Sequence, residues 1–173
     1  MRPQARSHLR LTTLAVVLAL SSLAALAATA AMAADPAPAA RQVLAAADLK
    51  LADYAGKVVV LDFWASWCKP CKLSMPWLSA LQRKYGPKGL QIVAISVDTD
   101  EKAMRSRLAD IDDGIVVVYD PEGDLAARYK LQGMPTTFLF GRDGKPAGSH
   151  LGYMEKDAPD REAEIAKLLE VKP

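Results

Sequence analysis

The stretch Val58–Cys71, VVVLDFWASWCKPC, decides the fold of this 173-residue chain. Its first seven residues form a continuous run of apolar, β-branched and aromatic side chains that contains one acid, Asp62. A run of this kind predicts a strand that is buried on both faces. Cys68 and Cys71 follow it with two residues between them, where a segment of helical periodicity begins. We therefore expect a buried strand, a short turn and a helix that starts at the cysteines.

Residues 1–33 have the pattern of a secretory signal peptide. A basic start is followed by a Leu- and Ala-rich run over 11–31 and by a small-x-small site that ends at Ala33. We expect cleavage near Ala33 and export to the periplasm, an oxidising compartment. The alternative is an uncleaved N-terminal membrane anchor, because the apolar run of about 20 residues is long enough to span a bilayer. An Ala- and Pro-rich linker over 34–47 and one domain over 48–173 complete the predicted organisation.

The charge balance excludes one class of partner. The chain has 22 basic and 20 acidic residues, and loss of Arg2, Arg6 and Arg10 with the signal would leave 19 basic residues. A nearly neutral chain is not expected to bind nucleic acid or anionic membrane surfaces through its charge. Two cysteines so close together make no disulfide framework, so we expect a monomer that is held together by its hydrophobic core.

Hydrophobic periodicity predicts an alternation of strands and helices. In order, we expect an edge strand over 49–54, a central strand over 58–64, a helix over 69–84 kinked at Pro76, a strand over 90–97, a helix capped by Asp98 or Asp100, a strand over 115–119, a short helix over 124–129, a hairpin of strands over 136–140 and 147–151, and a closing helix over 162–171. The inward face of the first long helix is predicted to carry Leu73, Trp77, Leu78, Leu81 and Tyr85. This order predicts an α/β fold in which helices cover both faces of a mixed sheet.

The two cysteines are predicted to be a redox-active dithiol. A sulfur at a helix N-terminus lies near unpaired N–H groups and the positive end of the helix dipole, so the Cys68 thiolate is favoured, and Lys69 adds a cation. Pro70 suits a first helical turn, whose N–H groups have no partner within the helix. The turn should leave the Cys68 sulfur at the surface and bury that of Cys71. We therefore predict that Cys68 is the nucleophile that attacks a partner's disulfide and that Cys71 resolves the mixed disulfide, with no metal and no other cofactor.

Two structural interpretations of the pair are less favoured. A purely structural disulfide that closes so short a loop would constrain the unfolded chain little. A zinc site needs four ligands, and the histidines available in the chain are His8, in the signal segment, and His150.

Asp62 and two tryptophans are further candidates for the site. An acid in a strand buried on both faces should have a raised pKa, so Asp62 could accept the proton of Cys71 when that thiol becomes the second nucleophile. The alternative is that strand alternation directs Asp62 to solvent or to a polar partner. Trp64 and Trp67 flank the turn and could line the surface that binds the partner, although Trp64 could equally belong to the core.

Several motifs resemble those of the thioredoxin superfamily. FWASWCKPC resembles its active-site signature, and residues 134–137, MPTT, resemble its cis-proline loop. Pro76 matches the helix kink, Asp62 the buried acid and Gly152 the glycine after the last strand. The resemblance implies a thioredoxin-like three-layer sandwich in which Pro135 lies beside the sulfurs. It also implies that the substrate is bound by Trp67, Met134 and Thr136.

Further motifs resemble the exported TlpA/ResA-like branch of that superfamily. They are residues 95–98, 120–123 and 133–139, and the strand over 115–119 with the helix over 124–129 would be the insert typical of this branch. Its members are periplasmic or membrane-anchored thiol-disulfide oxidoreductases, several of which reduce apocytochrome c. The resemblance implies client proteins with disulfides and a membrane electron donor of the DsbD/CcdA type. Two positions depart from the pattern, since Ser74 stands where many members have an acid and Asp62 where many have Asn.

The sequence therefore favours a periplasmic thiol-disulfide oxidoreductase that acts mainly as a reductant. A thiol peroxidase is one alternative, but Cys68 has Trp67 and Lys69 beside it rather than the Thr and Arg that a peroxidatic turn needs. A thioredoxin-like copper chaperone is another, with His150 as the candidate imidazole ligand beside the thiolates. That class uses a wider spacing of its cysteines.

Overall fold

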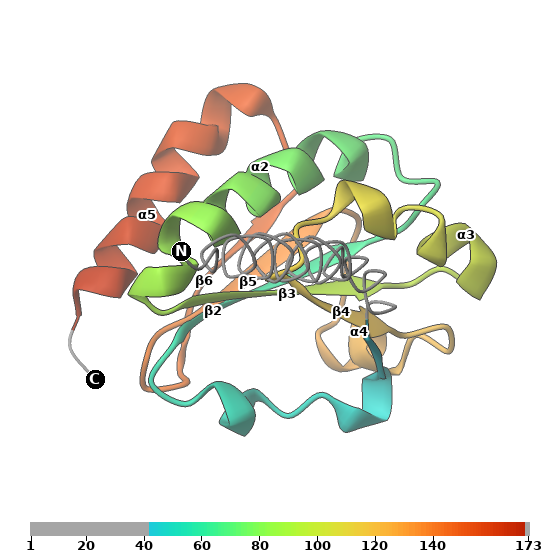
Figure 1. Cartoon of the computed structure of the whole chain (residues 1–173), viewed down its shortest axis with the longest axis horizontal. Helices are drawn as coiled ribbons and strands as arrows, with labels where there is room; N and C mark the ends of the chain where they lie inside the picture. Colours follow the sequence, from blue (N-terminus) through green and yellow to red (C-terminus); the bar gives the residue numbers. More distant parts are fainter. Residues whose placement is uncertain (1–41, 172–173) are drawn as a thin grey trace, which may run out of the picture. The chain divides into compact units, whose positions relative to one another are not determined.

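The computed structural model describes residues 42–171, and within them six strands form one mixed sheet (Figure 1). The order across the sheet is β1-β4-β3-β2-β5-β6. The strands are β1 (Val43–Ala45), β2 (Val58–Trp64), β3 (Leu90–Ser96), β4 (Val116–Tyr119), β5 (Thr136–Phe140) and β6 (Pro146–Leu151). The first four run parallel to one another, whereas β5 is antiparallel to β2 and β6 is antiparallel to β5. This confirms the predicted α/β fold with a mixed sheet.

Helices cover both faces of this sheet. They are α2 (Cys71–Tyr85), α3 (Glu101–Arg105), α4 (Asp124–Arg128) and α5 (Ala158–Glu170). Figure 1 shows α2 and α5 along one face of the sheet and α4 beneath the other. Each face has its own apolar cluster, and alternate residues of β2 contribute to each, with Val60 and Trp64 on the α2 side and Leu61 and Phe63 on the α4 side. The fold therefore has three layers, with the sheet in the middle and one apolar core on each side of it.

Strand β2 is the centre of the sheet, as its composition predicts. All seven of its residues are buried, since β3 and β5 pair with its two edges and helices cover both of its faces. The strand predicted over 115–119 and the short helix predicted over 124–129 are also present, as β4 and α4, and β4 lies between β3 and β1 in the sheet. The C-terminal ends of β2 and β3 lie at the same edge of the sheet, and the cysteines follow directly from that edge.

The predicted edge strand over 49–54 is wrong. Residues 46–48 and 51–54 form 3₁₀ turns, and the edge strand is β1, which lies in the segment predicted as a linker and pairs with residues 117–119 of β4. Leu49, Leu51 and Tyr54 instead pack against the apolar cluster on the α4 side. Their near-alternation reflects this half-burial beneath the sheet and not strand pairing.

Helix α2 begins at Cys71, two residues later than predicted, and continues through Pro76 to Tyr85. Its buried face consists of Cys71, Ser74, Met75, Leu78, Ser79, Leu81, Gln82 and Tyr85. Leu73, which was assigned to the inward face, is 53% exposed, so that assignment is wrong. The kink at Pro76 stays a prediction.

Helix α3 is shorter than its apolar stripe predicts. The Asp100 carboxylate accepts the N–H of Lys102 at 2.9 Å and caps the helix, which confirms one of the two predicted caps. Met104 is buried in this helix, but residues 108–110 form a 3₁₀ turn and Ile111 lies beyond them. Asp98, the other predicted cap, has a different set of partners.

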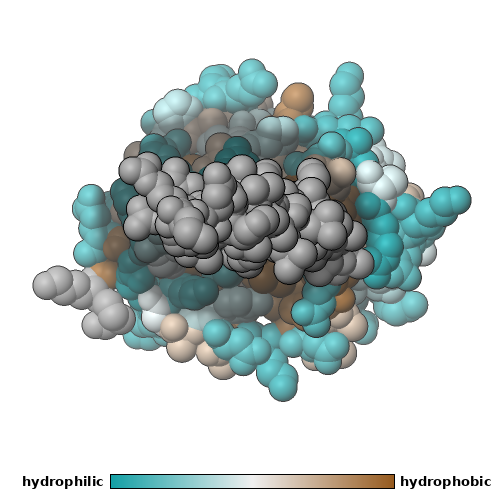
Figure 2. All heavy atoms as spheres, viewed as in Figure 1, coloured by the Kyte–Doolittle hydropathy of each residue, from teal (hydrophilic) through white to brown (hydrophobic). Residues whose placement is uncertain are grey.

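The surface of the described residues is largely polar, and in Figure 2 hydrophilic residues cover much of the coloured part of the face shown. Its exposed large apolar side chains are Trp67, Leu73, Leu151, Met154 and Val171. Between residues 42 and 171, no helix combines the length and the apolar character that a bilayer span requires. The predicted signal peptide or anchor over 1–33 lies outside the described residues.

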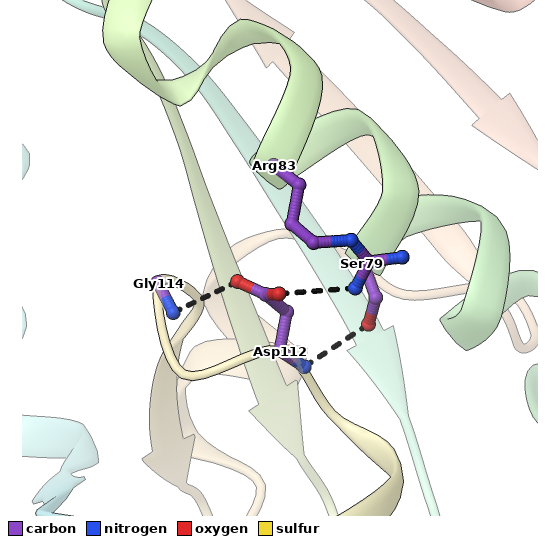
Figure 3. A network of polar contacts seen from close by, with 4 residues as sticks. All are labelled: Ser79, Arg83, Asp112 and Gly114. Atoms are coloured by element: carbon purple, nitrogen blue, oxygen red, sulfur yellow. Dashed lines mark hydrogen bonds and ion pairs between the residues drawn. The ribbon is translucent and has the colours of Figure 1, made fainter.

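Two groups of polar hydrogen bonds attach loops to the helices and strands. The first joins α2 to the loop before β4 (Figure 3), where Asp112 accepts hydrogen bonds from Arg83 and Gly114 and donates its own N–H to Ser79. The second is formed by Arg142, which follows β5 and donates to the carbonyl oxygens of residues 56, 88 and 169 at 2.8, 2.9 and 3.0 Å. Because β5 is antiparallel to β2, this second group lies at the end of β2 remote from the cysteines.

Candidate active site

The turn between β2 and α2 holds the two cysteines in a disulfide. Their Cα atoms are 5.3 Å apart. The N–H of Cys68 donates to the carbonyl oxygen of Ala65 at 3.1 Å, and the N–H of Cys71 donates to the Cys68 sulfur at 3.3 Å. The Cys68 sulfur therefore accepts a hydrogen bond from the first residue of α2. Once the disulfide is reduced, this N–H group and the positive end of the helix dipole would stabilise a thiolate at Cys68.

The two sulfurs differ less in exposure than the sequence predicts. Cys68 is 5% exposed and Cys71 is 2% exposed, and both belong to the apolar cluster on the α2 side, with Trp64 and Met75. The expectation that the Cys68 sulfur lies at the surface is thus wrong for the disulfide form, in which both cysteines are buried in this cluster. Trp67 is 66% exposed, so the residue before Cys68 is the accessible one.

The two residues between the cysteines complete the turn. Lys69 is exposed, and its carbonyl oxygen accepts the N–H of Lys72 at 3.2 Å. Pro70 occupies the position directly before α2 with helical backbone angles, φ −68° and ψ −25°. Its missing N–H removes no helical hydrogen bond at that position.

The loop before β5 is brought to the same edge of the sheet as the cysteines. Thr136 pairs with Phe63, near the end of β2, so the residues that precede Thr136 lie beyond that end. The Met134–Pro135 peptide bond is cis, as the resemblance implies. Met134 packs against the apolar cluster that contains both cysteines.

Two hydrogen bonds fix the shape of this loop. The Thr136 hydroxyl donates to the carbonyl oxygen of Gly133 at 2.6 Å, and the N–H of Gly152 donates to the carbonyl oxygen of Pro135 at 2.7 Å. Gly152 has φ +72°, a conformation that a glycine adopts without strain. Pro135 and Thr136 are buried and Met134 is half-buried, so Met134 is the most accessible of these three loop residues.

Asp62 is buried on the face of β2 that α2 and the cysteines cover. It is 1% exposed and lies between Val60 and Trp64 on the side that α2 covers, which excludes the solvent-facing alternative. The Thr137 hydroxyl donates to one of its oxygens at 2.8 Å, and the other has no hydrogen-bond partner among residues 42–171. Burial raises the pKa of Asp62 to about 7, although the Thr137 hydrogen bond and the positive charge of Arg161 both act to lower it.

A cleft of about 320 Å³ lies beside the second cysteine. Its wall is largely apolar, and charged side chains stand among the lining residues, which are Trp64, Ala65, Cys71, Lys72, Met75, Pro76, Arg107, Asp110 and Ile111. Trp64 is buried in this wall and is therefore a core residue, whereas the exposed tryptophan of the site is Trp67.

Asp98 is a neighbour of the site that the sequence analysis did not place there, since it was considered as a helix cap and as part of the motif over 95–98. It is buried at the end of β3, and its carboxylate accepts hydrogen bonds from Ser66 and Ser96. The available signal was topological: parallel strands end at a common edge, so an acid after β3 lies near the turn after β2. Thr137 and Arg161, which act on Asp62, were also missed because each is remote from it in sequence.

His150 lies on β6 and pairs with Glu164 of α5. Its Nε2 lies 2.7 Å from a carboxylate oxygen of Glu164 on α5. Within the described part of the chain, no group of three or more His, Cys, Asp or Glu side chains is arranged to hold a metal ion.

A family model described as Redoxin matches residues 32–169. The chain belongs to the Redoxin family. Its relatives include the thiol-disulfide oxidoreductase ResA of Bacillus thuringiensis subsp. konkukian (strain 97-27), which is 36% identical over 109 residues that span 63% of each protein. The thioredoxin-like protein YneN of Bacillus subtilis (strain 168) is 32% identical over 127 residues, which span 72% of this chain and 74% of YneN.

Solved structures confirm the thioredoxin-like architecture of this Redoxin-family chain. A Chlorobium tepidum protein assigned as the thiol:disulfide interchange protein DsbE superposes with a TM-score of 0.67 and 41% identity, over 70% of this chain and 86% of that one. The predicted membership in the thioredoxin superfamily, with similarity to ResA and DsbE, is thereby confirmed.

Proposed function

We propose that this Redoxin-family protein is a periplasmic thiol-disulfide oxidoreductase that reduces disulfides in exported proteins. The observation that carries the proposal is the Cys68 sulfur, which accepts the N–H of Cys71 at the start of α2 and shares a disulfide with it. The names of the relatives ResA and DsbE support the same reaction type. Export rests on the signal-like segment over 1–33, which would leave the protein soluble after cleavage near Ala33 or anchored to the membrane.

The reaction transfers two electrons from the dithiol to a client disulfide. The Cys68 thiolate attacks one client sulfur, forms a mixed disulfide and displaces the other client sulfur as a thiolate. Cys71 then loses its proton and attacks the Cys68 sulfur, which releases the second client thiolate and forms the Cys68–Cys71 disulfide. The protein ends oxidised and the client ends as a dithiol.

Asp62 is the proposed acceptor of the Cys71 proton. With a pKa of about 7, the carboxyl group can change its protonation state near neutral pH, which suits general acid–base catalysis. It lies on the sheet face that α2 and the cysteines cover, and one of its oxygens has no partner among the described residues.

Client binding is assigned to the residues around the turn. Trp67 offers an exposed aromatic surface directly before the nucleophile, and Met134, Pro135 and Thr136 form the loop at the same edge of the sheet. Aromatic and Met side chains provide adaptable apolar contacts, which suits a protein that binds several clients. Pro70 favours the reducing direction, whereas the positive charge of Lys69 stabilises the thiolate and shifts the dithiol toward oxidising behaviour.

Two partners follow from the proposed direction. A protein that delivers electrons must be reduced again after each reaction. A membrane electron donor of the DsbD/CcdA type would reduce the Cys68–Cys71 disulfide by thiol-disulfide exchange in the reverse direction. Apocytochrome c is a candidate client by resemblance. Ser74 argues against that client. Many members carry an acid at this position, whereas here a buried hydroxyl donates to the Cys71 carbonyl.

Reduction of insulin disulfides by dithiothreitol, followed as turbidity, tests the activity. We expect the wild-type protein without its first 41 residues to accelerate precipitation and the Cys68→Ala variant to be inactive. A reduction potential near that of thioredoxin, about −270 mV, would agree with a reductant, whereas one near about −120 mV would identify an oxidant. Consumption of hydrogen peroxide without insulin reduction would replace the proposal with a thiol peroxidase. Stoichiometric copper binding that is lost in His150→Ala would replace it with a copper chaperone.

A further inference from the structure

We propose that Asp98 is a positioning residue for the dithiol: its buried carboxylate fixes the Ala65–Ser66 peptide, which in turn holds the backbone of Cys68. The inference rests on the proposed function, since it concerns the same disulfide. It assigns a role to a residue that touches neither sulfur and lies 30 positions from Cys68 in the sequence.

The carboxylate of Asp98 accepts hydrogen bonds from three donors. The Ser66 N–H lies 2.9 and 3.2 Å from its two oxygens, and the Ser66 hydroxyl donates at 2.7 Å. The Ser96 hydroxyl donates at 2.8 Å. Asp98 is 2% exposed, so these donors replace the water that an exposed carboxylate would bind. Two of the three belong to Ser66, two residues before the proposed nucleophile.

The constraint reaches Cys68 through a single peptide unit. The N–H of the Ala65–Ser66 peptide donates to Asp98, and the carbonyl oxygen of the same peptide, on Ala65, accepts the N–H of Cys68 at 3.1 Å. A peptide unit is planar and rigid, so fixing its N–H end also fixes the direction of its carbonyl. Asp98 therefore fixes the position of the Cys68 backbone, from which the side chain extends and places its sulfur against the N–H of Cys71.

This placement should favour disulfide formation. A disulfide forms more readily when its two thiols are already held at bonding distance, because their effective concentration is then high. The measurable reaction is the exchange in which the protein dithiol and oxidised glutathione give the protein disulfide and two molecules of reduced glutathione. A looser turn lowers the equilibrium constant of this exchange.

Asn is a poorer partner than the carboxylate here. It lacks the negative charge that strengthens these hydrogen bonds, and its NH₂ group cannot accept the Ser66 N–H, although a serine hydroxyl can turn and accept from that group. We expect this variant to lower the glutathione equilibrium constant about five- to tenfold, which corresponds to the loss of about one net hydrogen bond. Ser66→Ala keeps the charge of Asp98 and removes only the hydroxyl donor, so it should lower the constant in the same direction, and Ser66→Thr should restore it.

Asp120→Asn is the matched control. Asp120 is also buried, and its carboxylate also accepts two backbone N–H groups, those of Leu125 and Ala126, but it anchors α4 and not the turn. It should lose stability in denaturant, as Asp98→Asn does, and keep the wild-type glutathione constant. That contrast separates positioning of the dithiol from a general loss of stability.

Two results would overturn the inference. They are an Asp98→Asn constant within twofold of the wild type and an equal change in Asp120→Asn. A change in Ser66→Ala that is smaller than that in Asp98→Asn agrees with the inference, because Ser66→Ala keeps the backbone N–H that donates to Asp98. Each variant is compared with the glutathione constant of the wild-type protein, and insulin reduction by the wild type is measured separately. If the wild type itself is inactive with insulin, the proposed function fails, whereas the glutathione constants still decide the role of Asp98.

Discussion

Asp62 shows how burial alone can prepare a group for proton transfer. The pKa of its carboxyl is raised from 3.8 to about 7 because the side chain is enclosed between the sheet and the helices on the α2 side. Between these two pH values the folded protein holds a proton that the unfolded chain has lost. The free energy of unfolding should therefore fall as the pH rises through this window, and the full penalty is present above about pH 7.

The Asp62→Asn variant should remove this pH dependence. Raising the pKa of Asp62 from 3.8 to about 7 destabilises the folded protein by about 4 kcal/mol above pH 7. The buried amide of Asn would have no partner for its NH₂ group, which costs about 1–3 kcal/mol and offsets part of the gain. We expect the oxidised variant to be about 1–3 kcal/mol more stable than wild type at pH 8 and no more stable at pH 4. Urea unfolding at both pH values measures the difference.

The exposed Asp53 provides a control for this experiment. Asp53→Asn should follow the wild-type stability at both pH values, because an exposed carboxylate keeps its hydration when the chain folds. A stability difference between Asp62→Asn and wild type that does not change from pH 4 to pH 8 would contradict the raised pKa of Asp62.

Helix α2 carries two sets of apolar side chains, and only one of them faces the sheet. Leu78 is fully buried in the cluster on the α2 side, whereas Leu73 in the same helix is mostly exposed. Leu78→Ala should cost about 2–5 kcal/mol through lost burial and the cavity that it leaves. Leu73→Ala should stay within about 0.5 kcal/mol of wild type. Urea unfolding of the two variants compares them directly, and equal losses would contradict the orientation of α2.

The same helix shows what local patterns can and cannot predict. Its existence, its end near Tyr85 and the burial of Leu78 and Leu81 follow from spacing of three and four residues. Leu73 fits the same spacing, and periodicity alone cannot say where an apolar stripe leaves the sheet. The residues over 49–54 mislead for a related reason, since half-buried 3₁₀ turns mimic the alternation of a strand.

Arg142 links distant parts of the described domain. Its guanidinium donates to carbonyl oxygens near the start of β2, before β3 and near the end of α5. Arg142→Ala leaves these acceptors without that donor, so we expect a loss of about 1–3 kcal/mol in urea unfolding. Hydrogen exchange should rise first in the last turn of α5.

The exposed Arg105 offers a matched substitution. It pairs with Glu101 within one turn of helix, so Arg105→Ala should change stability by no more than about 0.5 kcal/mol. If Arg142→Ala behaved like Arg105→Ala, the proposed link between the end of α5 and the sheet would contribute little.

At the scale of the whole molecule, the buried central strand, the alternation of strands and helices and the motifs that resemble thioredoxins together predicted the layered architecture. Two-sided burial of β2 requires neighbours at both edges and helices on both faces, which fixes most of the fold. The partners of Asp98 and Asp62 could not be predicted in the same way. Ser66 lies 32 residues from Asp98 and Thr137 lies 75 residues from Asp62, so only the folded sheet brings them together.

Trapping of mixed disulfides tests the central claim most directly. The reduced Cys71→Ala and Cys68→Ala variants would each be mixed with the same disulfide-containing protein, quenched in acid and weighed by mass spectrometry. The account predicts a covalent complex through Cys68 in Cys71→Ala and little or none in Cys68→Ala. A complex that forms through Cys71 in Cys68→Ala, with none in Cys71→Ala, would contradict it.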